Sequence, residues 1–170
     1  TRMTQVFRRS AGWTVGYNRQ FVCQRDSVLA TLPIGYGDGY RRSLTGRSNV
    51  IVRGLQVPVV GTISMNCIVA DVTAMANTPE GLPEAGEKVT LIGGDAQLRI
   101  SVEEIAEKSG TIPYVVTTQI GTHVERRYVG VENEFAQESQ FELRVAPEQV
   151  RKTVQPRQEK QLAEPRVASA

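Results

Sequence analysis

The stretch "NVIVRGLQVPVVG", residues 49–61, decides the fold class of this 170-residue chain. Two runs rich in β-branched residues flank Arg53 and Gly54, and this pattern predicts a β-hairpin whose turn lies at those two residues. Short apolar or alternating runs closed by turn residues recur elsewhere: "SVLATLPIGYG" (27–37), "CIVADV" (67–72) and "KVTLIGGD" (88–95). A series of short strands of this kind predicts a mainly-β fold, either a barrel or a sandwich.

One predicted helix interrupts the strands, at "SVEEIAEKSG" (101–110). Ser101 and Glu104 have the spacing of a capping box, and Gly110 is a stop signal. The apolar face of this helix consists of Val102, Ile105 and Ala106. We therefore expect a mainly-β domain, β-barrel-like or sandwich-like, with one or two short helices.

The composition changes after about residue 130. Residues 131–170 contain glutamines, scattered charges of both signs and several prolines, without a sustained hydrophobic period. Such a segment buries too little apolar surface to offset the entropy cost of ordering it. We predict one β-domain at residues 1–130 and a flexible C-terminal extension at 131–170. The opening "TRMTQVF" has no initiator-like start, as expected of a piece of a longer protein.

Charge and composition argue against several classes of function. The net charge of +2 is too small to indicate a nucleic-acid or acidic-membrane partner. An aromatic content of 6% disfavours an oligonucleotide-binding barrel, which needs stacking platforms. No apolar run approaches the roughly 20 residues that span a bilayer, and no signal-peptide pattern is present. We therefore predict neither a nucleic acid nor a membrane as a partner.

The cysteines and the histidine do not form a metal-binding pattern. Cys23 and Cys67 lack CxxC spacing, and His123 is the only histidine. We expect two reduced, mostly buried thiols, and a structural role for His123. No metal site is predicted.

The glycine cluster "GYGDGY" at residues 35–40 raises the question of a phosphate-binding loop. A dinucleotide fingerprint needs G-x-G-x-x-G opening a helix, whereas these glycines alternate and "RRSLTGRSNV" follows them. A sharp turn after a buried strand, with glycines adopting unusual φ angles, explains the cluster better.

A second tyrosine beside a glycine, Tyr17 in "TVGYNRQF", lies upstream of Tyr36. A phenol has a pKa near 10 and is a poor base at neutral pH unless cations or donors stabilise the phenolate. On local grounds, Tyr17 fits packing better than catalysis. On the same grounds, Met65 in "VVGTISMNCIVADV" fits a core methionine, Asn66 fits a turn or bulge residue, and Tyr114 after Pro113 fits a structural tyrosine.

The order and spacing of six segments carry more information than any one motif. These segments are "TVGYNRQF", "DSVLATLPIGYGDGYRR", "VPVVGTISMNCIVADVT", "GEKVTLIG", "SVEEIAEKSGTIPYVV" and "GTHVERRYV". Together they resemble the C-terminal β-domain of alanine racemases, over roughly residues 6–129. Alanine racemases are pyridoxal-phosphate enzymes built from a barrel and a β-domain.

The resemblance implies an activity, the interconversion of L- and D-alanine for peptidoglycan precursors, in the cytoplasm. Racemisation needs an acid/base group on each face of the substrate and a cofactor that stabilises the carbanion. In the family, one group is a lysine of the N-terminal barrel, which also binds pyridoxal 5'-phosphate covalently. The other is a tyrosine that the β-domain supplies to the partner subunit of a homodimer, and it corresponds to Tyr17. This chain lacks that barrel and is expected to be inactive alone.

Further site residues follow from the resemblance, one position at a time. Met65 corresponds to the residue whose backbone helps to hold the substrate carboxylate, and Tyr36 to the inner gate of the substrate corridor. Arg42 and Ile112 correspond to corridor residues. Tyr114 corresponds to the tyrosine that binds the cofactor phosphate, a charge-assisted hydrogen bond.

Two positions differ from the usual family pattern. Alanine racemases commonly have an aspartate after the methionine, where this chain has Asn66, and a corridor arginine where it has Thr62. Both changes keep open an alternative to strict alanine specificity, a broad-specificity racemase acting on serine, lysine or arginine. The missing barrel keeps open a second alternative, a non-catalytic, stand-alone β-domain.

Overall fold

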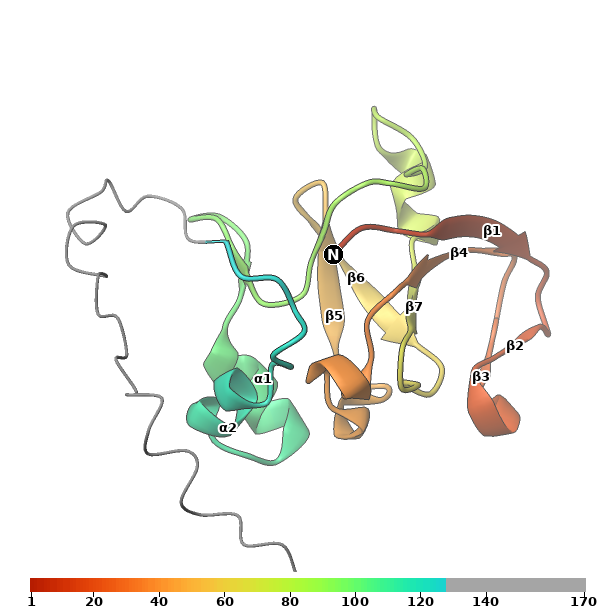
Figure 1. Cartoon of the computed structure of the whole chain (residues 1–170). Coiled ribbons are helices and arrows are strands. Elements are labelled where there is room, and N and C mark those ends of the chain that lie inside the picture. The colour runs from red at the N-terminus through yellow and green to blue at the C-terminus, as the bar shows by residue number, and fades with distance from the viewer. Residues whose placement is uncertain (128–170) are drawn as a thin grey trace, which may run out of the picture. The chain divides into compact units, whose positions relative to one another are not determined.

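The structure, a computed structural model, describes residues 1–127 and is mainly β, as the sequence predicts (Figure 1). Four short 3-10 turns (η) and two α-helices interrupt the strands. The elements are β1 (Gln5–Arg9), β2 (Thr14–Val15), η1 (Tyr17–Arg19), β3 (Phe21–Val22), β4 (Ser27–Leu32), η2 (Tyr36–Asp38), η3 (Arg42–Leu44), β5 (Asn49–Val52), β6 (Leu55–Val60), β7 (Ile68–Asp71), η4 (Thr73–Asn77), β8 (Val89–Thr90), β9 (Gly93–Gly94), β10 (Arg99–Ile100), α1 (Val102–Ser109) and α2 (Pro113–Thr118). The predicted C-terminal extension lies outside the described residues.

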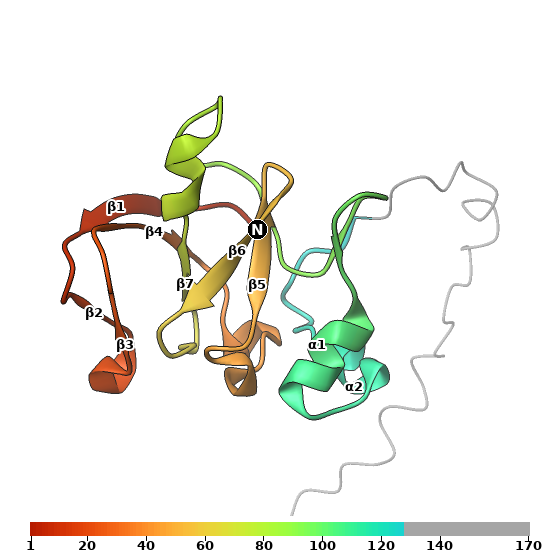
Figure 2. The same cartoon turned by 180° about the vertical axis from the view of Figure 1, so that it is seen from behind.

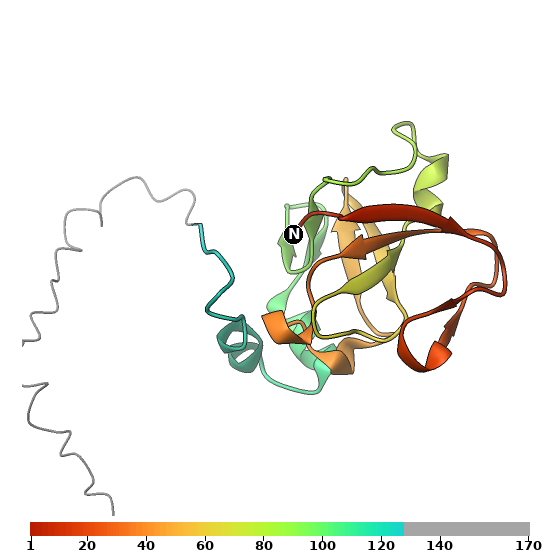
Figure 3. The ribbon, with the colours of Figure 1, turned by 45° about the vertical axis from the view of Figure 1, so that its right-hand side comes forward.

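Six of the strands form an antiparallel sheet in the order β1-β4-β7-β6-β5-β8. The sheet curls strongly, as Figure 3 shows. Its two edges are joined through the first residues of the chain: Met3 N donates to Glu87 O (2.9 Å), and Gly86 N donates to Met3 O (2.8 Å). These bonds satisfy backbone groups that an open edge would leave exposed, which gives the sheet its barrel-like form.

The hairpin predicted at residues 49–61 is present. β5 and β6 pair through Val52 and Leu55, so that Arg53 and Gly54 are the two turn residues. Their φ angles are 46° and 72°, and a two-residue hairpin with both φ angles positive is a type I′ turn. This turn matches the right-handed twist of the flanking strands.

Side chains of β4 are buried on both faces of the sheet. Val28, Ala30 and Leu32 belong to the main core, whereas Leu29 belongs to a second cluster on the opposite face. That cluster includes Val15, Cys23 and Val60, with Phe7, Phe21 and Val69 packed against it. The β2–β3 hairpin, which carries Tyr17 in its loop, is therefore packed onto the sheet by the cluster around Leu29.

The helix α1 begins and ends where the sequence predicts. Ser101 Oγ accepts a hydrogen bond from Glu104 N (3.1 Å), and Gly110 ends the helix in the left-handed region. The Glu104 carboxylate does not complete the capping box but pairs with Lys108 Nζ at 2.6 Å. Glu104 thus forms an i,i+4 ion pair in place of the hydrogen bond to the backbone of Ser101 that a capping box requires.

Two predictions need correction. The strand expected in "KVTLIGGD", closed by its glycines, is present as β8 but spans only Val89–Thr90, and Gly93 and Gly94 form a separate ladder, β9–β10. The thiol expectation holds for Cys23, which is buried, but Cys67 is only partly buried. Both thiols are free.

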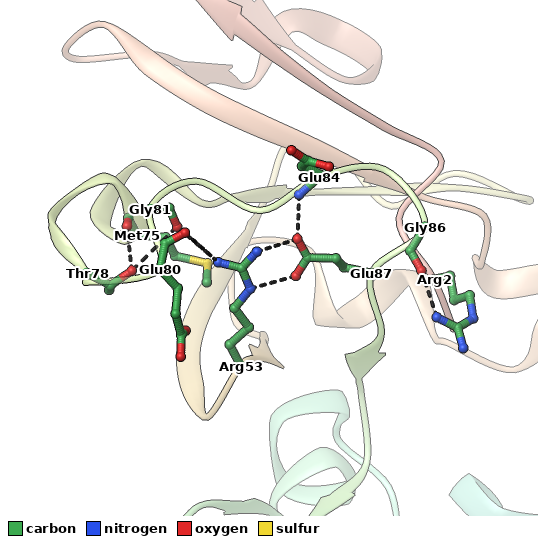
Figure 4. A network of polar contacts seen from close by, with 9 residues as sticks. All are labelled: Arg2, Arg53, Met75, Thr78, Glu80, Gly81, Glu84, Gly86 and Glu87. Atoms are coloured by element: carbon green, nitrogen blue, oxygen red, sulfur yellow. Dashed lines mark hydrogen bonds and ion pairs between the residues drawn. The ribbon is translucent and has the colours of Figure 1, made fainter.

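The turns and helices gather at the two ends of the curled sheet (Figures 1 and 2). One end holds η1, η2, η3, the β6–β7 loop, α1 and α2, and the opposite end holds η4. At that opposite end, Arg53 forms a two-pronged ion pair with Glu87 and donates to the carbonyls of Glu80 and Gly81 (Figure 4). This network is structural, and all predicted site residues lie on elements of the other end.

Candidate functional site

The β6–β7 loop, residues 61–67, is the centre of the candidate site, because it contacts two turns that carry predicted site residues. At its start, Thr62 Oγ1 donates to Tyr17 O at 3.0 Å. Near its end, Ser64 O and Met65 O accept hydrogen bonds from Tyr36 N (3.1 Å) and Gly37 N (2.9 Å). The loop therefore places the Tyr17 turn, the Tyr36 turn and Met65 beside one another.

The backbone around Tyr17 is strained. Asn18 and Arg19 have φ angles of 61° and 52°, and Arg53 is the one other described non-glycine residue with a positive φ. Non-glycine residues pay an energetic cost for this conformation, and such residues cluster at functional sites. The strained turn presents Tyr17 with its side chain 63% exposed.

The Tyr36 turn is organised by Asp38. Asp38 Oδ2 accepts from Gly35 N (2.8 Å), and Oδ1 lies 2.9 Å from His123 Nε2. The hydrogen bond from His123 holds the pKa of Asp38 below its ordinary value, and the N–H of Gly35 lowers it further against the effect of burial. His123, expected to be structural, thus ties the segment after α2 to this turn.

The two tyrosines of "GYGDGY" have different environments. Tyr36 is exposed, whereas Tyr40 is buried in the main core. Burial raises the pKa of Tyr40 to about 12, so this phenol stays protonated at neutral pH. Only Tyr36 of the pair is available to a ligand.

A tight turn at residues 64–67 projects Met65 and Asn66 into solvent. Ser64 Oγ donates to Cys67 O at 2.7 Å, and Cys67 N donates back to Ser64 Oγ at 3.1 Å. Met65 is 55% exposed, although methionine usually fills gaps in a core. The expectation of a core methionine on local grounds is therefore wrong.

Arg42 lies beside Tyr36 in a cleft of about 690 Å³. The cleft also takes in residues at the ends of both helices; its lining is Tyr36, Gly39, Arg41, Arg42, Ser43, Ser109, Gly110 and Gln119. The cleft is cationic, because its lining contains two arginines and no carboxylate. It connects the Tyr36 turn to the end of α2, since Gln119 caps that helix.

Ile112 and Tyr114 lie at the start of α2, and both are strongly exposed, at 56% and 77%. Pro113 is the first residue of α2, where a missing N–H has no consequence and a fixed φ favours the helix. The Tyr114 hydroxyl has no hydrogen-bond partner within residues 1–127 and is free to donate to a ligand. It therefore fits the predicted role at a cofactor phosphate.

Exposure sets the predicted site residues apart from the rest of the fold. Eight large hydrophobic side chains of the described chain are exposed, and five of them were predicted as site residues: Tyr17, Tyr36, Met65, Ile112 and Tyr114. Exposed apolar groups gathered at one end of a domain indicate a surface that binds a partner or a ligand.

Residues 1–127 contain two lysines. Lys108 Nζ pairs with Glu104, and the backbone of Lys88 forms a β-bridge with Arg2. Residues 1–127 contain no cluster of three or more His, Cys, Asp or Glu side chains that could hold a metal ion. A cavity of about 1080 Å³ lies elsewhere in the domain and is not lined by Tyr17, Met65 or Tyr114. Across residues 1–127, no helix has the length and apolar character needed to cross a membrane.

The fold and the exposed residues together define a class: a small curled β-domain that presents aromatic and polar side chains at one end. Comparison with protein families matches residues 1–128 to the family described as "Alanine racemase, C-terminal domain". The chain therefore belongs to the alanine racemase C-terminal domain family, as the sequence predicts.

Individual relatives agree with this family. The chain is 44% identical over 119 residues to alanine racemase of Clostridium kluyveri, covering 70% of this chain and 29% of the relative. It is 42% identical over 119 residues to that of Geobacter sulfurreducens, covering 69% and 30%. The chain thus spans about a third of the length of these relatives.

Solved structures show the same similarity. The crystal structure of alanine racemase from Bartonella henselae, which has covalently bound pyridoxal phosphate, matches with a TM-score of 0.67 and 34% identity. The match covers 75% of this chain and 33% of that one. Alanine racemase from Streptomyces lavendulae matches with a TM-score of 0.69 and 32% identity, covering 76% and 32%.

Proposed function

We propose that this chain is the β-domain of a pyridoxal-phosphate-dependent alanine racemase, an isomerase, and that Tyr17 is its acid/base residue. The observation that carries the proposal is the Tyr17 turn. A strained backbone, fixed to the β6–β7 loop, holds a phenol 63% exposed at the end of the domain where the other predicted site residues lie. The Tyr17 hydroxyl has no partner within residues 1–127, so its proton is available for transfer.

Racemisation requires that a proton leaves one face of the α-carbon and that a proton arrives at the other face. When bound, pyridoxal phosphate supplies stabilisation of the carbanion between these two events. Tyr17 Oη holds and moves the proton on one face. The group for the other face and the lysine that binds the cofactor belong to a barrel domain outside this chain.

The remaining exposed residues bind and orient the substrate. Met65 N has no acceptor within residues 1–127, and its N–H suits a carboxylate oxygen. Tyr36 and Arg42 line the approach, where the cationic cleft attracts the carboxylate of an amino acid. Asn66, next to Met65, and the exposed Ile112 contact the substrate, and Tyr114 donates to the cofactor phosphate.

The proposal includes an assembly and a biological setting. The exposed Tyr17 is directed to the active site of the partner subunit in a homodimer, so each dimer has two shared sites. The product D-alanine serves peptidoglycan precursors, and the enzyme acts in the cytoplasm. The isolated chain is expected to be inactive.

The decisive experiment measures exchange of the substrate α-proton in D2O, using the full-length parent subunit loaded with cofactor. Tyr17→Phe should abolish racemisation and abolish α-proton exchange from one enantiomer only, because the acid/base group of the other face remains. Tyr114→Phe is the matched control, which should affect both enantiomers alike. Undiminished exchange from both enantiomers in Tyr17→Phe would show that Tyr17 is not the acid/base residue.

A broad-specificity racemase is the second candidate. It is favoured by the β6–β7 loop, whose residues 61–67 carry no charged side chain. With Asn66 and Thr62 neutral, little electrostatic selection acts on the substrate side chain. A panel of alanine, serine, lysine and arginine separates the candidates: comparable kcat/KM values support broad specificity, and a preference for alanine supports the first proposal. Activity on none of the four would favour a non-catalytic β-domain.

A further inference from the structure

We infer that Thr62 is a positioning residue for Tyr17: its hydroxyl fixes the strained turn from which Tyr17 acts. The inference rests on the proposed acid/base role of Tyr17 and adds a residue on which this role depends. Thr62 itself makes no contact with the reacting atoms and acts through the backbone of Tyr17.

The contact joins the side chain of Thr62 to the carbonyl of Tyr17 itself. Thr62 Oγ1 lies 3.0 Å from Tyr17 O and 3.4 Å from Gln20 Oε1. A hydroxyl has one proton, and the shorter distance assigns it to Tyr17 O. The Gln20 amide can then donate its own N–H to Oγ1, since the oxygen and nitrogen of an amide are assigned from the network. Thr62 thus bridges the two ends of the Tyr17 turn.

Few other interactions hold this turn. Within residues 1–127, the Thr62 hydrogen bond is the one that ties residues 16–19 to the β6–β7 loop. The two backbones also approach closely: a Cβ added to Gly16 would lie 2.6 Å from Thr62 N. The glycine allows the approach, and the Thr62 hydroxyl fixes its orientation.

Because the Tyr17 turn is strained, its conformation depends on the hydrogen bond from Thr62. Asn18 and Arg19 adopt positive φ angles that side chains disfavour, so the turn relaxes if its restraint is removed. The carbonyl of Tyr17 and its Cα–Cβ bond belong to the same residue, and rotation of one moves the other. Because Tyr17 is exposed within residues 1–127, packing inside the domain does little to keep the phenol in place. A displacement of about 1 Å at an acid/base group can cost about 100-fold in rate.

The experiment compares Thr62→Val and Thr62→Ser in the full-length parent subunit with bound cofactor. Valine keeps the shape of threonine and removes the hydroxyl, whereas serine keeps the hydroxyl and removes the methyl group. Exchange of the α-proton in D2O is measured separately for each enantiomer. We expect Thr62→Val to slow the exchange that depends on Tyr17 by about tenfold or more, and to leave exchange from the opposite face within about twofold. Thr62→Ser should restore most of the rate.

The two faces act as internal controls for each other, because a misfolded or cofactor-poor variant loses exchange at both. Equal rates for Thr62→Val and wild type would overturn the positioning role, and so would equal losses in Thr62→Val and Thr62→Ser. A loss at both faces in Thr62→Val, with normal thermal stability and cofactor content, would also overturn it. The Tyr17→Phe variant separates the two proposals. If Tyr17→Phe abolishes exchange at one face while Thr62→Val leaves the rate of that exchange unchanged, only the inference about Thr62 fails.

Discussion

The His123 Nε2 atom lies 2.9 Å from Asp38 Oδ1, a contact between residues 85 positions apart in the sequence. A carboxylate only accepts, so the imidazole donates here. Asp38 is also joined to the same segment through its backbone, since Gly121 N donates to Asp38 O at 3.2 Å. The turn that carries Tyr36 is thus clamped between the segment after α2 and the β6–β7 loop.

The Asp38 contact predicts a specific dependence of stability on pH. The pKa of Asp38 is lower in the folded protein than its ordinary value of 3.8, chiefly because of the bond from His123. A depressed carboxyl pKa contributes stability that is present above the ordinary pKa and is lost as the pH falls through the folded-state value. We expect Asp38→Asn to be less stable than wild type at pH 7, and the difference to shrink as the pH falls below about 4. Urea unfolding at both pH values measures it. A difference that stays constant with pH would contradict the assignment.

We predict that position 35 needs glycine because the β6–β7 loop lies too close for a Cβ, and not because the backbone conformation excludes other residues. Its φ of −155° is open to any residue, but an added Cβ would lie 2.2 Å from Ser64 O. Gly35→Ala should therefore push the Tyr36 turn off the β6–β7 loop, costing about 2 kcal/mol or more, and raise KM for the amino acid.

Gly46 provides the matched control for Gly35. Its φ of 69° makes alanine strained, but nothing lies within 4 Å of an added Cβ. Gly46→Ala should cost about 1 kcal/mol of stability and leave KM unchanged. Thermal melts and steady-state kinetics on the parent subunit test the pair, and a rise of KM in both variants would argue against a role of the Gly35 contact in the site.

The two clusters of apolar side chains predict different effects for two leucines of one strand. Leu29 and Leu32 are both fully buried in β4, and truncation of either to alanine should cost about 2–5 kcal/mol. Only Leu29→Ala should loosen the β2–β3 hairpin, whose Cys23 N–H bonds to Trp13 O at 2.8 Å. Hydrogen exchange would then show that the Cys23 amide loses more protection in Leu29→Ala than in Leu32→Ala. A greater loss of protection in Leu32→Ala than in Leu29→Ala would contradict the packing of the hairpin on the cluster around Leu29.

Local signals in the sequence were sufficient for the β5–β6 hairpin and for α1. The turn at Arg53-Gly54 and the ends of α1 depend on residues within a few positions of each other, and both were predicted correctly. The strand expected in "KVTLIGGD" is present but shorter than its apolar run, because only Val89 and Thr90 pair with β5. The sequence of one strand does not show how long its pairing with the neighbouring strand is.

Long-range contacts explain what could not be predicted at the site. Tyr17 and Met65 suggest packing when taken alone, and only their exposure in the folded chain shows otherwise. The contacts of Thr62 with Tyr17 and of His123 with Asp38 join residues 45 and 85 positions apart. No local pattern marks such pairs, since a lone threonine or histidine is compatible with many environments. The family resemblance predicts a set of site residues because it carries this spatial information.

Tyr114 provides a test of cofactor binding that does not depend on the acid/base assignment. Its hydroxyl, on an exposed side chain at the first turn of α2, is proposed to donate to the cofactor phosphate. A hydrogen bond to a charged group contributes about 1.5–3 kcal/mol, so Tyr114→Phe should weaken binding of pyridoxal phosphate by about 10- to 100-fold. Absorbance titration of the cofactor-free parent subunit measures the affinity, with Tyr36→Phe as the control that should leave it unchanged. If the two variants bind the cofactor with equal affinity, the phosphate is held by other groups and Tyr114 has another role.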